Sequence, residues 1–199
     1  MTVDRQRFEM ALARIDAANG EDPTRRTFEG REYPYALLYG LRMTHWLTHL
    51  EPDAPEVVQL AVRAQHICRW KIPRSEYPLD RAGYHRWRTR LYEFHAQTAG
   101  QILAEVGYDE ANITEVQNLL RKRELKSNPR TQLLEDVACL VFLENDFSQL
   151  AREHDEAKII DILRKTWRKM SDRGHAAALA MPLAASERTL IEKALAATQ

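Results

Sequence analysis

The chain has 199 residues, and its 29 lysines and arginines are balanced by 29 aspartates and glutamates. This length suits one domain with a sizeable core and is short for two, so we expect a single domain over residues 1–199. The charge balance excludes the overall basic excess of a dedicated nucleic-acid binder, and any electrostatic recognition must come from a local patch.

Two further exclusions follow from composition. Cys68 and Cys139 lie in apolar segments without CxxC spacing, which indicates reduced structural thiols rather than a disulfide framework or a zinc ribbon. No apolar run approaches the roughly 18 residues of a membrane span, and MTVDRQRFEM lacks the apolar core of a signal peptide. We therefore expect a cytoplasmic protein without membrane association. There is no nicotinamide or flavin signature.

The apolar residues recur at spacings of three and four, which predicts helices and no sheet. The polar segment through Pro34, NGEDPTRRTFEGREYP, is expected to be a loop. The run VACLVFL is apolar on all sides, so its helix is expected to be central. The helices are predicted over residues 4–19, 35–50, 55–70, 84–106, 110–124, 129–151, 156–173 and 186–198.

Two of the histidines on these predicted helices adjoin apolar residues at helical spacing. His66 shares one side of the third helix with Arg69 and Trp70, and His95 lies in the middle of the long helix among apolar neighbours. Such histidines could converge in a bundle core with a carboxylate and form a metal or acid/base site. Alternatively, each is a core histidine with satisfied hydrogen bonds.

Glu135 and Asp136 directly precede the apolar run of the central helix, so at least one must face the packed interior. A buried carboxylate needs a partner, which can be an arginine, a histidine or a metal ion. A structural ion pair with an arginine of the loop is the alternative to a functional role.

The segment KIPRSEYPLDRAG, residues 71–83, contains two prolines and a glycine and is predicted to be a long, ordered loop. Arginines and aromatic residues within and around it would suit an anionic ligand, because guanidinium groups bind phosphate or carboxylate and rings stack. The alternative is that the arginines bind backbone carbonyls of the loop. The predicted substrate-binding residues are Arg69, Trp70, Arg74, Tyr77, Arg81, Tyr84 and Arg88.

The segments IDAANGEDP, AQHICRWKIPRSEYP, GYHRWR, LEDVACLVFLEN and KTWRKMS resemble the uncharacterised family called domain of unknown function 4202, over nearly the whole chain. That family name implies no activity. More distantly, the order of helices is similar to that of the HD-domain phosphohydrolases, which are all-helical metal enzymes. This resemblance implies a divalent metal held by His66, His95 and Asp136. Ile67 replaces the defining aspartate, so His66 could instead act as a base or bind substrate without a metal.

We therefore expect an all-α, single-domain helical bundle with an HD-like arrangement. It would be a divergent hydrolase or lyase acting on a phosphorylated or otherwise anionic small molecule, such as a nucleotide, with His66 and Glu135 as catalytic groups. Two alternatives stay open: a non-catalytic module that binds a nucleotide or RNA, and a helical interaction protein.

Overall fold

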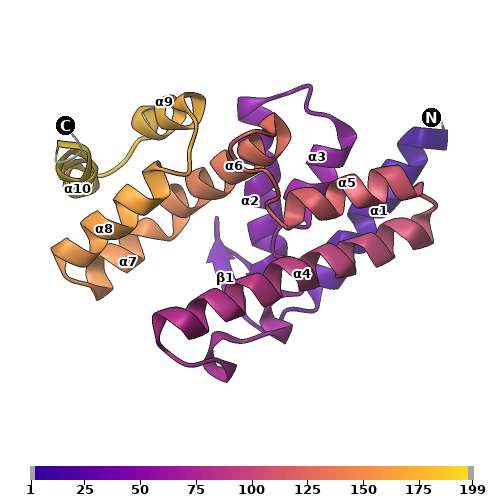
Figure 1. The fold of residues 1–199 in the computed structure, drawn as a ribbon, viewed down its shortest axis with the longest axis horizontal. Helices are drawn as coiled ribbons and strands as arrows, with labels where there is room; N and C mark the ends of the chain where they lie inside the picture. The colour runs from indigo at the N-terminus through magenta and orange to yellow at the C-terminus, as the bar shows by residue number, and fades with distance from the viewer. Residues whose placement is uncertain (1–2, 197–199) are drawn as a thin grey trace. The chain divides into compact units, whose positions relative to one another are not determined.

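The computed structural model describes residues 3–196 and is mainly helical (Figure 1), which confirms the all-α prediction. The chain divides into two compact units, Met1–Thr131 and Gln132–Gln199. The expectation of a single domain stays a prediction.

The first unit is built from five helices that pack mainly on one another. Helix α4 runs along α5 (Figure 1), α3 contacts α2 and α5, and α1 contacts α2, α3 and α4. Fully buried side chains such as Ile15, Leu47, Leu60 and Leu103 form its core. The helices are α1 Val3–Gly20, α2 Tyr35–Leu50, α3 Glu56–Arg63, α4 Arg81–Val106 and α5 Glu110–Leu120, with 3₁₀ turns at Arg69–Lys71 and Arg74–Glu76.

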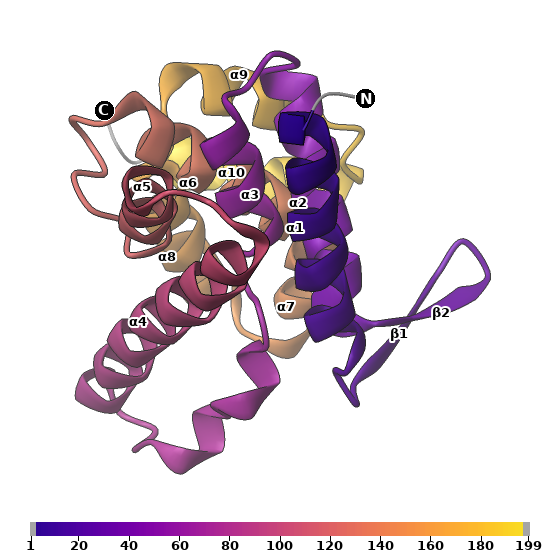
Figure 2. The same cartoon turned by 90° about the vertical axis from the view of Figure 1, so that its right-hand side faces the viewer.

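An antiparallel hairpin stands where a loop was predicted, so the expectation of no sheet is wrong. Its strands, β1 Arg25–Phe28 and β2 Arg31–Pro34, extend away from the neighbouring helices in Figure 2. Glu29 and Gly30 make the two-residue turn, with φ of 49° and 75°. The strand residues are mostly exposed, so no alternation of apolar and polar residues marks them in the sequence.

The third helix ends at Arg63, whereas the sequence predicted it through Trp70. Beyond it the chain turns, and Cys68 adopts a left-handed conformation with φ 51°. The Cys68 backbone N–H donates a hydrogen bond to Oδ1 of the buried Asn19, at 3.1 Å. This partner lies 49 residues away, so helical periodicity within the segment could not reveal the turn.

Two other helix ends differ from the prediction for local reasons. Helix α4 starts at Arg81 rather than at residue 84, because the Asp80 carboxylate accepts the Gly83 backbone N–H at 2.6 Å and caps the helix. Helix α5 stops at Leu120 rather than at residue 124, since Lys122 and Glu124 adopt positive φ of 57° and 55°.

The second unit contains shorter helices than predicted. The predicted helix 129–151 is divided between two helices, and the predicted helix 156–173 ends at Trp167. The final helix was predicted to residue 198, and residues 197–198 lie outside the described residues. Helix α8 contacts both α7 and α10. The helices are α6 Pro129–Asn145, which begins at the end of the first unit, α7 Phe147–Glu153, α8 Glu156–Trp167, α9 Asp172–Ala180 and α10 Ala185–Ala196.

Helix α9 was not predicted, because Gly174 was interpreted as the end of the preceding helix. Ser171 caps α9 by accepting the Gly174 backbone N–H at 3.2 Å. A Cβ at Gly174 would lie 2.8 Å from Oδ1 of Asp136, so this glycine allows close packing inside a helix.

Replacing Gly83 by alanine is expected to lower the free energy of unfolding by about 1–3 kcal/mol, because a Cβ there would lie 2.1 Å from the Pro78 carbonyl oxygen. Gly20→Ala is the matched control, since a Cβ at Gly20 meets nothing within 4 Å at the end of α1. Urea denaturation of both variants measures the difference. Equal stabilities would contradict this packing of the loop on α4.

Candidate functional site

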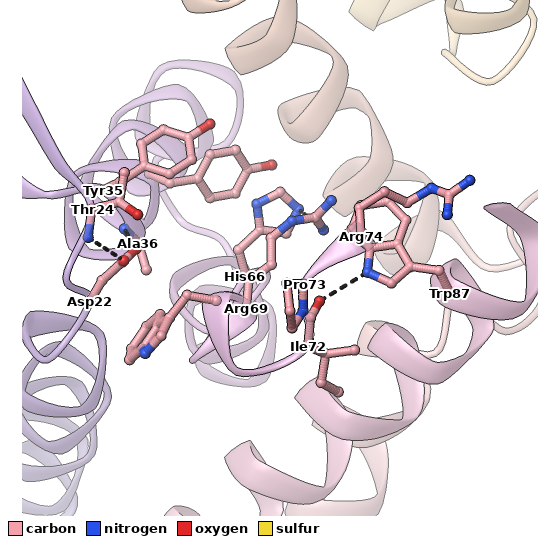
Figure 3. Close-up of a pocket in the computed structure, with 12 residues that line it drawn as sticks. Asp22, Thr24, Tyr35, Ala36, His66, Arg69, Ile72, Pro73, Arg74 and Trp87 are labelled. Atoms are coloured by element: carbon pink, nitrogen blue, oxygen red, sulfur yellow. Dashed lines mark hydrogen bonds between the residues drawn. The ribbon is translucent and has the colours of Figure 1, made fainter. Parts of the chain in front are cut away.

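A pocket of about 200 Å³ lies in the first unit, between the start of α2, the turn after α3 and the first part of α4 (Figure 3). Its walls combine aromatic rings with a histidine, two arginines and a carboxylate. The lining residues are Asp22, Thr24, Tyr35, Ala36, Tyr39, His66, Arg69, Trp70, Ile72, Pro73, Arg74 and Trp87.

Asp22 builds one edge of this pocket. Its Oδ1 accepts the Thr24 backbone N–H and its Oδ2 accepts the Ala36 backbone N–H, both at 2.9 Å. The Tyr35 N–H donates to the Thr24 carbonyl at 2.8 Å, so Asp22 joins the base of the hairpin to the first turn of α2. Sequence reasoning missed this residue, although an aspartate two residues before a threonine is a common turn signal.

Arg69 brings an unpaired positive charge into the pocket. Its NH1 lies 3.2 Å from Nε2 of His66, and its guanidinium lies 4.6 Å from the centre of the Trp87 ring. It forms no ion pair within residues 3–196. Burial lowers the pKa of Arg69, but a guanidinium stays charged at neutral pH. A partly buried charge without a counterion is a strong attractor for an anion.

His66 is held between Arg69 and an aromatic ring. Its imidazole stacks on Tyr39 with 3.9 Å between ring centres and 17° between planes. Because arginine only donates, Nε2 of His66 must accept that hydrogen bond, and the imidazole hydrogen sits on Nδ1. Burial, and then the charge of Arg69, holds the pKa of His66 well below its ordinary value. His66 is therefore neutral at pH 7.

His95, on α4, is the second histidine of the site, with its ring centre 5.8 Å from that of His66. Its side chain is 2 % exposed. Burial, followed by the charges of Arg69 and Lys122, lowers the pKa of His95 to about 3. Its Nε2 is buried and has no hydrogen-bond partner among the residues that the structure describes.

Lys122 also belongs to this environment and was not predicted. Its Nζ is buried, and its charge acts on both histidines. The only signal in the sequence is its place in the basic segment RKRELK, which does not distinguish it from the exposed Arg123.

The segment after Arg69 is tied to the start of α4. Arg74 donates hydrogen bonds to the carbonyls of Tyr77 and Pro78 at 2.8 and 2.6 Å. Trp87 Nε1 donates to the Ile72 carbonyl at 2.9 Å, as Figure 3 shows. Arg74 thus makes the structural contacts expected under the alternative interpretation of the loop arginines. Its role in binding substrate stays a prediction.

Of the other predicted substrate-binding residues, one lines the pocket and the rest lie outside its lining. Trp70 lines the pocket. Arg88 lies on α4, donates to Tyr84 Oη at 3.1 Å and also to Tyr92 Oη. Tyr77 is half-buried in the loop, and Arg81 is exposed in the first turn of α4.

Glu135 and Asp136 belong to the second unit, and both are buried. Oδ1 of Asp136 accepts the Ser171 backbone N–H at 2.8 Å, and Oδ2 accepts the Ser171 hydroxyl at 2.5 Å. Glu135 lies 3.8 Å from Lys169 Nζ, so a lysine of the same unit is one of its partners. The ion pair with a loop arginine stays a prediction. Both carboxylates contact the turn between α8 and α9.

These contacts suit a metal ion poorly. Nε2 of His66 already accepts from Arg69, and Asp136 already accepts from Ser171. Within residues 3–196, no group of three or more histidines, cysteines, aspartates or glutamates is arranged to hold a metal ion. The metal site at His66, His95 and Asp136 stays a prediction.

Comparison with known proteins gives a family and no activity. The family model described as "Domain of unknown function (DUF4202)" matches residues 9–191. No curated protein and no solved structure matches the chain, so the similarity to HD-domain enzymes stays a prediction. Over the described residues, no helix has both the length and the apolar character needed to span a bilayer.

Acidification is expected to destabilise the protein through His95. Unfolding returns the pKa of His95 from about 3 to an ordinary value near 6.5, so the unfolded chain binds more protons between these values. Stability is therefore complete above pH 6.5 and falls as the pH falls. Between pH 7 and pH 5, His95 alone should cost about 2 kcal/mol.

Urea denaturation at the two pH values tests this expectation. His95→Phe should remove that part of the pH dependence, whereas His85→Phe, at an exposed position of the same helix, should retain it. An unchanged pH dependence in His95→Phe would mean that His95 is not buried as a neutral group.

Proposed function

Because the chain belongs to the DUF4202 family, whose description names no activity, we propose its function from the pocket itself. The first unit binds a small phosphorylated or otherwise anionic molecule in the pocket at His66 and Arg69. The first candidate function is binding of this anion, and a hydrolase or lyase reaction on it is the second.

The observation that carries the proposal is the unpaired Arg69 guanidinium in the pocket wall. In folded proteins, buried arginines are usually matched by carboxylates. Arg63 is an example, because both oxygens of Asp16 accept hydrogen bonds from it at 2.6 Å. Among the residues that the structure describes, Arg69 has only the neutral His66 and the ring of Trp87 as side-chain partners. A ligand anion would supply the missing charge.

The remaining pocket walls suit the uncharged part of such a ligand. Tyr35, Trp70 and Trp87 offer ring faces and edges next to the arginine. The volume of about 200 Å³ is below the ~300–1,000 Å³ typical of pockets for drug-sized ligands. This size favours an anionic group with a short attached portion over a polymer such as RNA.

Catalysis by a hydrolase or lyase reaction is the second candidate, and the neutral state of His66 favours it. A neutral imidazole can accept a proton, as a general base must. Nε2 of His66 is engaged by Arg69 in the free protein. A ligand that draws the Arg69 hydrogen bond to itself would release this nitrogen to act on water or on the ligand. Glu135 stays a predicted catalytic group.

Arg69→Met is expected to abolish stabilisation of the protein by anionic ligands, because it keeps the apolar stem and removes the charge. We expect AMP or glycerol 3-phosphate to raise the melting temperature of the wild type, with a gain of about 2.7 kcal/mol at a concentration 100 times Kd. Differential scanning fluorimetry at constant ionic strength measures the shift. Arg86→Met, at an exposed position of α4, is the matched control and should behave like the wild type.

A shift that persists in Arg69→Met, or is lost equally in Arg86→Met, would contradict the proposed site. Tighter binding of a short RNA than of either small molecule, with affinity falling steeply with salt, would favour the RNA-binding alternative instead.

Asp136→Asn tests whether this carboxylate is structural or a metal ligand. We expect its free energy of unfolding to fall by about 1–3 kcal/mol, since the bonds to Ser171 are weakened. Metal content, measured by inductively coupled plasma mass spectrometry, should equal that of the wild type. Asp172→Asn, on the exposed start of α9, is the control. Stoichiometric metal that disappears only in Asp136→Asn would support the predicted metal site.

A further inference from the structure

The buried Nε2 of His95 is a polar atom that the fold leaves without a hydrogen bond, among the residues described. Such atoms are rare in native proteins and usually meet a water molecule or a ligand. His95 adjoins His66, whose ring lines the pocket, with 5.8 Å between ring centres. His95 does not itself line the pocket and its Nε2 is closed to solvent, so a ligand group at the His66 end reaches it only when the side chains between them shift.

A second arginine near this point also lacks a carboxylate. Arg88 donates to the hydroxyls of Tyr84 and Tyr92, which are uncharged, and forms no ion pair in the described part of the chain. It is near enough to Arg69 and His66 for its charge to act on both. Two like charges, Arg69 and Arg88, therefore stand close to the histidine pair, and each raises the electrostatic cost of the other.

We propose that the ligand carries a phosphate monoester dianion, and that its oxygens bind both the Arg69 guanidinium and the Nε2–H of His95. This inference rests on the proposed binding function and specifies the ligand class. It also assigns His95 as a ligand-binding residue.

The number of charges and of donors supports a monoester over other anions. Two arginines, Arg69 and Arg74, line the pocket with one carboxylate, Asp22, and the charge of Arg88 also acts on Arg69. This excess of positive charge suits a dianion better than the single negative charge of a carboxylate or a phosphodiester. Arg69 and the Nδ1–H of His66 are N–H donors of the site, and His95 adds a third in the tautomer that the proposal assigns to it, with the hydrogen on Nε2. A phosphate monoester has three terminal oxygens to accept from them, and a diester or a carboxylate has two.

The charges also distinguish an anion from a cation at the histidine pair. Two neutral imidazoles could in principle hold a transition metal. The positive charges of Arg69 and Lys122 lower the pKa of His95, and the positive potential that they create also disfavours a divalent cation. The same positive potential stabilises a dianion.

Isothermal titration calorimetry at pH 8 with three aromatic probes tests the inference: phenyl phosphate, methyl phenyl phosphate and benzoate. These share a ring and differ in charge and in the number of terminal oxygens. The wild type is expected to prefer phenyl phosphate to the other two by about tenfold or more. His95→Phe should lose this preference. His95→Gln should retain most of it, because the amide nitrogen of glutamine can replace Nε2–H.

Two further variants separate failure of this inference from failure of the binding function. His85→Phe should bind like the wild type, and Arg69→Met should bind none of the probes. If His95→Phe keeps the preference while Arg69→Met loses binding, the role of His95 is overturned and the binding function stands. If Arg69→Met binds as the wild type does, or the wild type binds no probe, the binding function itself fails.

A direct readout covers the case in which His95→Phe does not fold. In ¹⁵N spectra of histidine-labelled wild type, the His95 Nε2 resonance, assigned with His95→Gln, should shift with phenyl phosphate and not with benzoate. A resonance that phenyl phosphate leaves unmoved would overturn the inference, and would indicate that a buried water satisfies His95.

Discussion

The pocket depends on one backbone hydrogen bond, from the Cys68 N–H to Oδ1 of Asn19. Cys68, which makes this bond, adopts a left-handed conformation beyond the end of α3 at Arg63, and such a conformation is incompatible with a single helix running to Trp70. If the helix did continue, His66 and Arg69 would lie one turn apart along its face. The turn instead directs the chain past α2, where His66 stacks on Tyr39 and Arg69 reaches Trp87.

Helical periodicity predicted most helices of the fold, because an apolar stripe is a local property of the sequence. The features that it missed depend on partners far along the chain or on exposed backbone. Cys68 needs Asn19, and the hairpin has few buried residues. Each is a long-range or turn-specific effect that a window of neighbouring residues does not contain.

For the site, the sequence correctly predicted that His66 and Arg69 lie close together. The reason was wrong, because the predicted helix was expected to contain both residues and α3 ends at Arg63. It also placed His95 on a long helix with an inward face, and the structure buries that residue. For Asp22 and Lys122 it held only weak signals, a turn-forming aspartate and a basic segment, because their positions follow from a hairpin and from a turn with positive φ. Nor could it show that Asp136 has its hydrogen-bond donors within its own unit.

The ties of the loop to α4 have a consequence for how a ligand is received. Arg74 donates hydrogen bonds to backbone carbonyls of the loop. Trp87 donates to the Ile72 carbonyl, and its ring contacts the Arg69 guanidinium. The guanidinium and the segment around it have thus lost their conformational entropy during folding, before any ligand arrives. Association then requires little further ordering of the protein, and more of the interaction energy remains as affinity. A small ligand with few contacts can be bound usefully by such a pre-organised wall.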